Sequence, residues 1–223
     1  MTIEPIAVFH SPVSGKFGIP RQAGLVSELR GTISLLKPYN NPEALRGLDG
    51  FDYLWLIWGF SLNSREDGFK ATVRPPRLGG NERIGVFASR SPFRPNSMGL
   101  SSVRILEVNA SGCEITVSGA DLADGTPIYD IKPYVEYADS HTGIRSGFVD
   151  SKEWEPLEVV LPEALCSELG ASDAAALRGI LGQDPRPQYQ DDPQREYGLV
   201  FKGRDIKFKV TGNILTVISS KAI

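Results

Sequence analysis

The chain has 223 residues, with 24 Lys and Arg against 27 Asp and Glu, and 41% of it is hydrophobic. This length and apolar content predict a folded protein with one large domain or one medium and one small domain. The net charge of −3 argues against indiscriminate polyanion binding, because a non-specific nucleic-acid binder usually carries a basic surplus. No apolar run has the length of a membrane span, and the first residues lack a signal-peptide pattern, so we expect a cytoplasmic protein.

Motifs for several common chemistries are missing from the sequence. Cys113 and Cys166 have no CxxC spacing and no nearby histidine, so we expect neither a disulfide framework nor a zinc site. The two histidines, His10 and His141, lie far apart, and GxGxxG, Walker, GxSxG and HExxH motifs do not occur. A serine, cysteine or metal hydrolase therefore has little support, and we expect no metal.

The first part of the chain reads as short strands joined by loops rich in Gly and Pro. Residues 3–12 form a short apolar run that ends at a proline, and Phe51–Phe60 is an aromatic and β-branched run that predicts a strand buried on both faces. Further strands are expected over 83–88, 100–108, 113–120 and 126–135, with a hairpin turn at Asn109–Gly112. Many short strands without long helices between them predict a closed or nearly closed antiparallel barrel.

A polar stretch over 136–156 predicts a connection between two domains, which we place at 1–150 and 151–223. Beyond it, 162–182 is the one convincing helical region, with Ser172 as an N-cap of its alanine-rich part and Gly182 at its end. Residues 197–210 and 213–220 then read as a three-stranded meander, with turns at 203–204 and 212–213. The predicted fold is mainly β: an N-terminal antiparallel β-barrel followed by a small α+β domain.

Positive charge is concentrated in one segment of this acidic chain. Between Arg74 and Arg104 there are six arginines, no lysine and a single acid, Glu82. Arginine's planar fork matches phosphate and carboxylate groups through paired hydrogen bonds. Prolines stiffen the loops 16–24, 72–80 and 89–99, and a fourth loop, 119–134, carries acids. Loops of this kind fit a ligand with both anionic and cationic groups, although each could serve only as a solvated turn.

Six motifs in order carry a family resemblance: IPRQAGL, GLDGFDYLWLIW, VRPPRLGGN, GVFASRSPFRPNSMGLS, DLADGTPIYDIKPY and DPRPQY. This series resembles the TsaA-like, or TrmO, family of tRNA threonylcarbamoyladenosine methyltransferases. The resemblance implies a non-Rossmann β-barrel that binds S-adenosylmethionine and a C-terminal domain that helps to bind tRNA. It also implies a homodimer that methylates N6 of threonylcarbamoyladenosine just 3′ of the anticodon.

The resemblance also implies site residues. The cofactor contacts would map to Gln22, Ala23, Gly24, Phe60, Ser61, Arg90, Leu100, Gly119, Ala120 and Asp121. S-adenosylmethionine has a zwitterionic tail, so we expect Arg90 to bind its carboxylate and Asp121 its ammonium group. The adenine needs an apolar slot, which we place near Phe60 and Leu100.

The tRNA side of the site rests on charge. We expect it to involve Arg74, Arg77, Arg94, Asn96, Lys132 and Arg186. Candidates for a general base are Asp130, Asp184 and Tyr189, each of which could equally be a turn residue or a partner of Arg186. Basic residues of the terminal hairpin, Lys202, Arg204, Lys207 and Lys209, extend the track or form a solvated face.

Two other functions stay open on the sequence. One is a non-catalytic RNA- or nucleotide-binding β-barrel that keeps the electropositive loops without turnover. The other is an S-adenosylmethionine-dependent methyltransferase that acts on a small metabolite.

Overall fold

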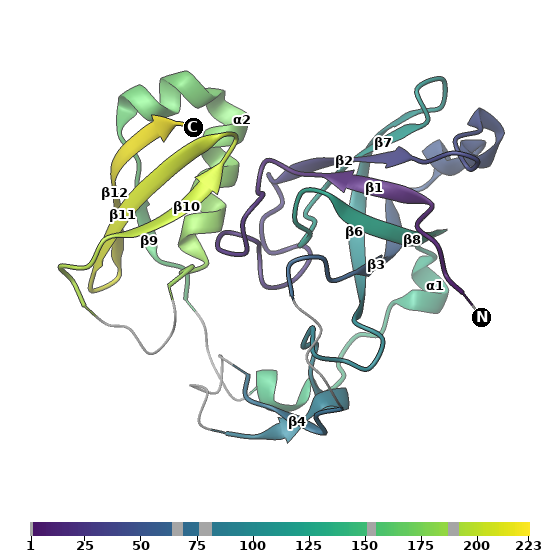
Figure 1. The fold of residues 1–223 in the computed structure, drawn as a ribbon, viewed down its shortest axis with the longest axis horizontal. Helices are drawn as coiled ribbons and strands as arrows, with labels where there is room; N and C mark the ends of the chain where they lie inside the picture. Colours follow the sequence, from purple (N-terminus) through teal and green to yellow (C-terminus); the bar gives the residue numbers. More distant parts are fainter. Residues whose placement is uncertain (1, 64–68, 76–81, 151–154, 187–191) are drawn as a thin grey trace.

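The computed structural model describes residues 2–63, 69–75, 82–150, 155–186 and 192–223. Figure 1 shows a β-barrel beside a separate sheet that packs on a long helix, with a small ribbon that holds β4 below them. None of the described helices is long and apolar enough to cross a membrane.

The barrel closes in the order β1-β2-β7-β6-β3-β8, with every neighbouring pair antiparallel. Its strands are β1 (Ala7–His10), β2 (Arg30–Leu35), β3 (Tyr53–Gly59), β6 (Met98–Asn109), β7 (Glu114–Ser118) and β8 (Thr126–Pro133). The pairing of β1 with β8 closes the ring, so the predicted antiparallel barrel is confirmed. Strand β2 is the one barrel strand that the sequence analysis does not single out.

Apolar side chains at alternate positions fill the barrel. In β3, Leu54, Leu56 and Trp58 point inward and are at most 6% exposed. Because successive residues of a strand point to opposite faces, the outward side chains include Tyr53, which is 43% exposed. The expectation that this strand is buried on both faces is therefore wrong for its outer face, which other elements cover only in part.

The predicted strand over 83–88 is much shorter in the structure. Only β5 (Ile84–Gly85) is extended, paired with β4 (Thr72–Val73), and the 3-10 turn η4 (Val86–Ala88) follows it. Within the described ranges, the other short helical elements are η1 (Pro42–Leu45), η2 (Leu48–Gly50), α1 (Glu136–Asp139) and η5 (Gly147–Val149). The turn between β6 and β7 confirms the hairpin at Asn109–Gly112.

The C-terminal part is a sheet of order β10-β11-β12-β9 that packs on helix α2 (Glu163–Gly182). Strands β10 (Tyr197–Phe201), β11 (Arg204–Thr211) and β12 (Ile214–Ala222) form the predicted meander. Strand β9 (Glu158–Val160) adds a parallel fourth strand, which the sequence analysis does not predict. The helix ends at Gly182 as expected, and it breaks at Gly170, two residues before the predicted N-cap Ser172.

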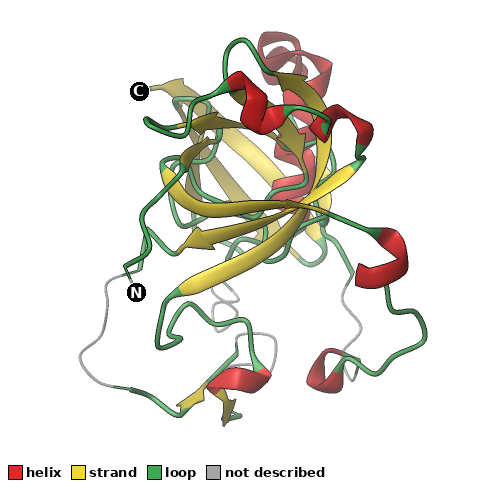
Figure 2. Cartoon of the chain, turned by 90° about the vertical axis from the view of Figure 1, so that its right-hand side faces the viewer, coloured by secondary structure: helices red, strands yellow, loops and turns green. Residues whose placement is uncertain are grey.

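The two parts share a hydrophobic core. Val26 and Leu29, which precede β2, are buried together with Leu177 and Ile180 of α2. Lys202 also donates its backbone N–H to the carbonyl of Pro12 over 2.8 Å. Figure 2 shows the barrel from its own side, with the helix and the second sheet behind it. The segment that leads into β2 is therefore fixed by the C-terminal part.

Candidate functional site

The predicted cofactor loops meet at the end of the barrel where β3 ends and β8 begins. The backbone N–H of Gly24 donates to the carbonyl of Gly119 over 2.8 Å. Both residues have a positive φ, 82° and 76°, which glycine adopts without steric cost. Gly24 is exposed and a side chain added there would enter open space, so the backbone of Gly24 is accessible to a ligand.

A chain of hydrogen bonds runs from the barrel core to this end. The indole Nε1–H of Trp58 donates to Oγ of Ser101 over 2.9 Å, and Ser101 Oγ–H donates to Oδ1 of Asp121 over 2.5 Å. Trp58 and Ser101 are 6% and 2% exposed, respectively. The carboxyl of Asp121, on the loop before β8, is therefore held from inside the barrel.

The ionisation of Asp121 depends on opposing effects. Burial raises its pKa above the ordinary value of 3.8. Hydrogen bonds from Ser101 and from the backbone, together with the positive charge of Arg90 and the backbone N–H of Ala23, act against this rise in pKa. These groups support the charged carboxylate in a place where solvent does so poorly.

Arg90 and Gln22 complete the set. Arg90 is exposed, and its Nη1 donates to Oε1 of Gln22. Three loops that are far apart in sequence therefore present a guanidinium, an amide and a carboxyl group close together. An exposed guanidinium and a half-buried carboxyl group fit the two charged ends of an amino-acid moiety.

Phe60 and Ser61 lie at the same end, directly after β3. The Phe60 ring packs edge-on against Trp58 with a centroid distance of 4.5 Å, and its N–H donates to the carbonyl of Ser97 over 3.0 Å. Ser61 Oγ lies 3.4 Å from Oγ1 of Thr126. Leu100 is 57% exposed on the outward face of β6, so its side chain does not share the inward face of Ser101.

Next to Phe60 there is a cavity of about 370 Å³. It is lined by Gly59, Phe60, Asn63, Asn96, Ser97, Pro127 and Tyr129. The buried side-chain oxygen of Asn63 has no hydrogen-bond partner. The cavity therefore joins an aromatic ring to amide groups, and it includes Asn96, one of the expected substrate contacts.

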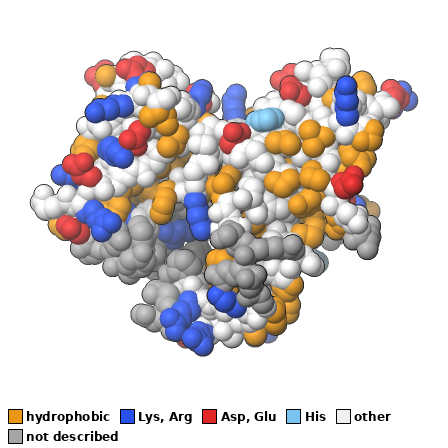
Figure 3. Space-filling view, viewed as in Figure 1, with side chains coloured by type: hydrophobic (Ala, Val, Ile, Leu, Met, Phe, Trp, Pro, Cys, Tyr) orange, Lys and Arg blue, Asp and Glu red, His pale blue; other side chains and the backbone are white. Residues whose placement is uncertain are grey.

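The expected tRNA-binding arginines have different environments. Arg74 is exposed just after β4, whereas Arg94 donates to the backbone carbonyls of Ser89 and Val86 over 2.7 and 3.3 Å and lies over the Phe87 ring. Arg94 thus holds its own loop in shape. Arg77 lies outside the described residues. Figure 3 shows Lys and Arg side chains gathered on the lower lobe, over the segment that holds β4.

The loop after α2 forms a tight pair of charges. Arg186 Nε and Nη2 donate to the two carboxylate oxygens of Asp184 over 2.9 and 3.0 Å, and the side chains are 11% and 22% exposed. Arg21 Nη2 donates to the backbone carbonyl of Asp184 over 3.0 Å. This loop is therefore attached to the cofactor loop that carries Gln22.

The three candidate bases are not brought together among the residues that the structure describes. Asp130 lies midway along β8, where its carboxylate pairs with Lys132 over 3.0 Å. Asp184 is engaged by Arg186, as the alternative reading of the sequence allows. Tyr189 lies outside the described residues.

Acids pair with the basic side chains of the terminal hairpin. Lys202 pairs with Asp173, Arg204 with Glu168, Lys207 with Asp205 and Lys209 with Glu196. Figure 3 shows blue and red side chains close together over this part of the molecule. The arrangement is that of a mixed-charge surface.

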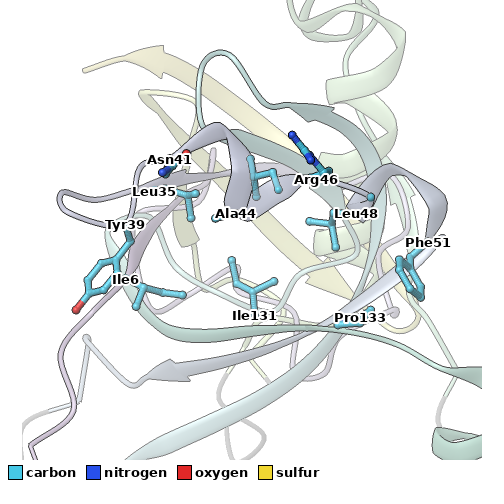
Figure 4. Close-up of a pocket in the computed structure, with 12 residues that line it drawn as sticks. Ile6, Leu35, Tyr39, Asn41, Ala44, Arg46, Leu48, Phe51, Ile131 and Pro133 are labelled. Carbon is cyan, nitrogen blue, oxygen red and sulfur yellow. The ribbon is translucent and has the colours of Figure 1, made fainter.

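A larger cavity, of about 540 Å³, lies at the opposite end of the barrel and contains none of the expected site residues. Figure 4 shows Ile6, Leu35, Leu48 and Ile131 facing a common space, with Arg46 at its edge. Within the described ranges, no group of three His, Cys, Asp or Glu side chains could hold a metal ion.

The sequence analysis does not single out Trp58 or Ser101. The signal that could have found Ser101 is its place in β6, where the inward positions after it hold Val103 and Ile105. A hydroxyl group on an apolar inward face needs a hydrogen-bond partner, and here it has two.

Comparison with known proteins finds relatives that match along nearly the whole chain. The N-terminal domain of tRNA-methyltransferase O matches residues 8–140, and the TrmO C-terminal domain matches residues 155–223. The tRNA (adenine(37)-N6)-methyltransferase of Escherichia coli strain K12 is 37% identical over 93% of this chain and 92% of its own length. RcsF of Pseudomonas aeruginosa, described as an S-adenosylmethionine-dependent methyltransferase, is 41% identical over 89% of this chain and 87% of its own length.

A solved structure has the same fold. The crystal structure of TrmO from Pseudomonas aeruginosa superimposes with a TM-score of 0.80 at 31% identity, covering 100% of this chain and 99% of that one. Two domain matches in order, relatives of matched length and a full-length structural match lead to one conclusion. The chain belongs to the tRNA-methyltransferase O (TrmO) family.

Proposed function

We propose that the protein is an S-adenosylmethionine-dependent tRNA methyltransferase that acts on N6 of adenosine 37, in its threonylcarbamoyl form. Family membership supports the activity, the tRNA substrate and the methyl donor. The observation on which the proposal depends most is the convergence of Gln22, Arg90 and Asp121 from three loops at one end of the barrel.

The residues at this end fit the cofactor. A carboxyl group whose charged form receives hydrogen bonds from Ser101 and the backbone suits a cationic partner, and Arg90 suits a carboxylate. The exposed backbone of Gly24 leaves room for close approach. When bound, S-adenosylmethionine supplies a methyl group on a positively charged sulfur, open to in-line displacement.

The chain's own contribution is mainly positional. Holding donor and acceptor in line can give effective molarities of about 10⁵–10⁸ M, without a nucleophilic residue. The proton on the acceptor nitrogen needs an acceptor, and Asp130, Asp184 and Tyr189 stay as candidates for that role. Because Lys132 and Arg186 pair with the two aspartates, either one would have to leave its partner to act.

We assign tRNA binding to the arginine loops. In this proposal exposed Arg74 binds phosphates, Arg77 of the same sequence motif is assigned the same role, and Arg94 keeps its loop in shape near Asn96. Arg186, between two prolines, binds the RNA backbone or the threonyl carboxylate. The protein works as a cytoplasmic homodimer. Size-exclusion chromatography with light scattering should therefore give a mass of twice the 24.3 kDa of one chain.

Methyl transfer to defined tRNAs tests the function. We expect labelled methyl groups from S-adenosylmethionine to enter tRNA that carries threonylcarbamoyladenosine, and not tRNA that lacks the threonylcarbamoyl group. If calorimetry detects no binding of S-adenosylmethionine, the result would instead favour a non-catalytic RNA-binding barrel. Equal inactivity on both tRNAs with cofactor bound would favour a methyltransferase of a small metabolite.

The two arginines with separate roles give a further prediction. Arg90→Ala should weaken S-adenosylmethionine binding about tenfold or more and change tRNA binding little, because one charge-assisted hydrogen-bond partner is lost. Arg186→Ala should have the reverse effect. Titrations of both variants with both ligands check this, and equal losses for both ligands in both variants would contradict the division of roles.

A further inference from the structure

The hydrogen bonds behind Asp121 run in one direction. An indole N–H can only donate, so the hydroxyl of Ser101 accepts from Trp58 and has its own hydrogen left to donate. The acceptor of that hydrogen is Oδ1 of Asp121, at 2.5 Å. The order of donors and acceptors is therefore fixed by the chemistry of the first group, and it ends on a carboxylate.

The two upstream residues are held rigidly. Trp58 and Ser101 are diagonal partners on the paired strands β3 and β6. Trp58 lies opposite Gly99, and Ser101 lies opposite Leu56, two residues away along each strand. Both side chains are buried in the barrel, and the ring of Phe60 packs against Trp58. A hydroxyl group in this position has little freedom to turn away, so it fixes the Asp121 carboxyl group from behind.

On the ligand side, Asp121 has one charged neighbour. Among the described residues, Arg90 is the one charged side chain that affects its ionisation, and Ala23 contributes a backbone N–H. Oδ1 accepts from Ser101, so this oxygen points toward the barrel core. The carboxylate is thus oriented from the core side, and it lies near the guanidinium group of Arg90.

We propose that Ser101 is a positioning residue for S-adenosylmethionine: with Trp58 as its fixed donor, it orients the Asp121 carboxylate toward the ammonium group of the cofactor. This inference rests on the proposed function, because it takes Asp121 as the cofactor's anionic contact. Ser101 itself does not touch the cofactor.

Calorimetric titration of variants tests this role. We expect Ser101→Ala to weaken S-adenosylmethionine binding about tenfold, the usual effect of losing a hydrogen bond to a charged group. Ser101→Thr keeps the hydroxyl group and should restore affinity to within about threefold of the original protein. Ser102→Ala, which removes a hydroxyl group from the opposite face of the same strand, is the matched control and should bind normally.

The choice of ligand sharpens the titration. S-adenosylhomocysteine keeps the ammonium group and lacks the positive sulfur. If Ser101 acts through the ammonium group, Ser101→Ala should lose affinity for both ligands by the same factor. A loss confined to S-adenosylmethionine would overturn the assignment to the ammonium group.

The pH dependence separates positioning from a merely structural effect. Because the Ser101 hydrogen bond lowers the pKa of Asp121, removing it should move the acid-side midpoint of cofactor binding to higher pH in Ser101→Ala and not in Ser101→Thr. Unchanged affinity and an unchanged midpoint in Ser101→Ala would overturn the proposal.

A measurement without ligand keeps the test independent of the proposed function. The carboxyl ¹³C shift of Asp121, followed by NMR as a function of pH, should show a higher pKa in Ser101→Ala than in the original protein. If the original protein fails to bind S-adenosylmethionine while the pKa of Asp121 is higher in Ser101→Ala, the proposed function fails and the orientation of Asp121 by Ser101 stands. If the pKa of Asp121 is the same in both proteins, the proposed role of Ser101 fails, whatever the protein binds.

Discussion

Asp121 is the residue whose environment makes the strongest demands. Its charged form should bind the cofactor, whereas burial favours its neutral form. We expect Asp121→Asn to lower S-adenosylmethionine affinity about 10- to 100-fold, because a hydrogen bond between charged groups is lost. Affinity of the original protein should also fall as the pH drops through the raised pKa, by about tenfold per pH unit at most. Calorimetry between pH 4 and pH 8 measures both effects.

The raised pKa of Asp121 affects the stability of the fold in the direction opposite to its effect on cofactor affinity: stability gains at low pH, whereas affinity falls. A carboxyl group whose pKa is raised by folding stabilises the fold at a pH below the ordinary value of 3.8, and this contribution disappears as the pH rises through the raised pKa. Asp121→Asn should therefore melt no lower than the original protein at neutral pH. Thermal unfolding checks this, and a clearly lower melting temperature at neutral pH would show that the charge stabilises the fold.

Individual residues differ in how far the sequence predicts them. Gln22, Arg90 and Asp121 lie in motif loops, and the structure does bring these three together. Ser101 closes one of the six motifs, but its hydrogen bonds to Trp58 and Asp121 join residues distant in sequence, so the motif alone does not reveal the role proposed for it. Arg94 has the residue type of a phosphate ligand, but its nearest acceptors are carbonyl groups of its own loop, and only coordinates reveal this.

At the scale of elements, the segment before β2 depends on helix α2. Gly179 packs so closely on Val26 that an added Cβ would lie 2.7 Å from its Cγ1. Overpacking of this kind costs about 1–3 kcal/mol, more than the gain of up to about 1 kcal/mol from replacing glycine in a helix. We expect Gly179→Ala to lower stability and, because the same segment carries Gln22, to weaken S-adenosylmethionine binding about threefold.

Gly182→Ala is the control for this prediction. It adds the same methyl group at the end of the same helix, where the nearest atom would lie 3.5 Å away, an ordinary contact. Thermal unfolding and calorimetry of both variants measure the difference. Equal behaviour of the two variants would show that the contact with Val26 does not position the cofactor loop.

The strands were predictable to different degrees for a physical reason. β6 and β7 and the C-terminal meander are built from local hairpins, and β8 shows alternating side chains, patterns that a sequence displays directly. β9 pairs in parallel with β12, far along the chain, and its three residues give no pattern of their own. β5 is short because the chain turns into η4 directly after Gly85.

At the scale of the molecule, the distribution of charge separates two kinds of basic surface. Exposed Arg74 lies in a segment with few acids, whereas Lys207 pairs with Asp205 over 3.1 Å. We expect Arg74→Ala to reduce the slope of log affinity for tRNA against log salt by about 1, as for the loss of one phosphate contact. Lys207→Ala should leave the slope unchanged. Binding measured at several salt concentrations decides, and a larger effect for Lys207 would place the RNA on the terminal sheet.

The division of the chain at 150/151 stays a prediction, and the shared core bears on what such a division would mean. Val13, Val26 and Leu29 belong to the N-terminal part, yet they are buried among α2 and the terminal strands. Excising residues 151–223 would expose these three side chains to water. It would also remove the packing that holds the segment between β1 and β2, which carries Gln22. The intact protein should accordingly unfold in a single cooperative transition in calorimetry. An isolated fragment of residues 1–150 should bind S-adenosylmethionine more weakly than the intact protein even where its β-strands are still folded.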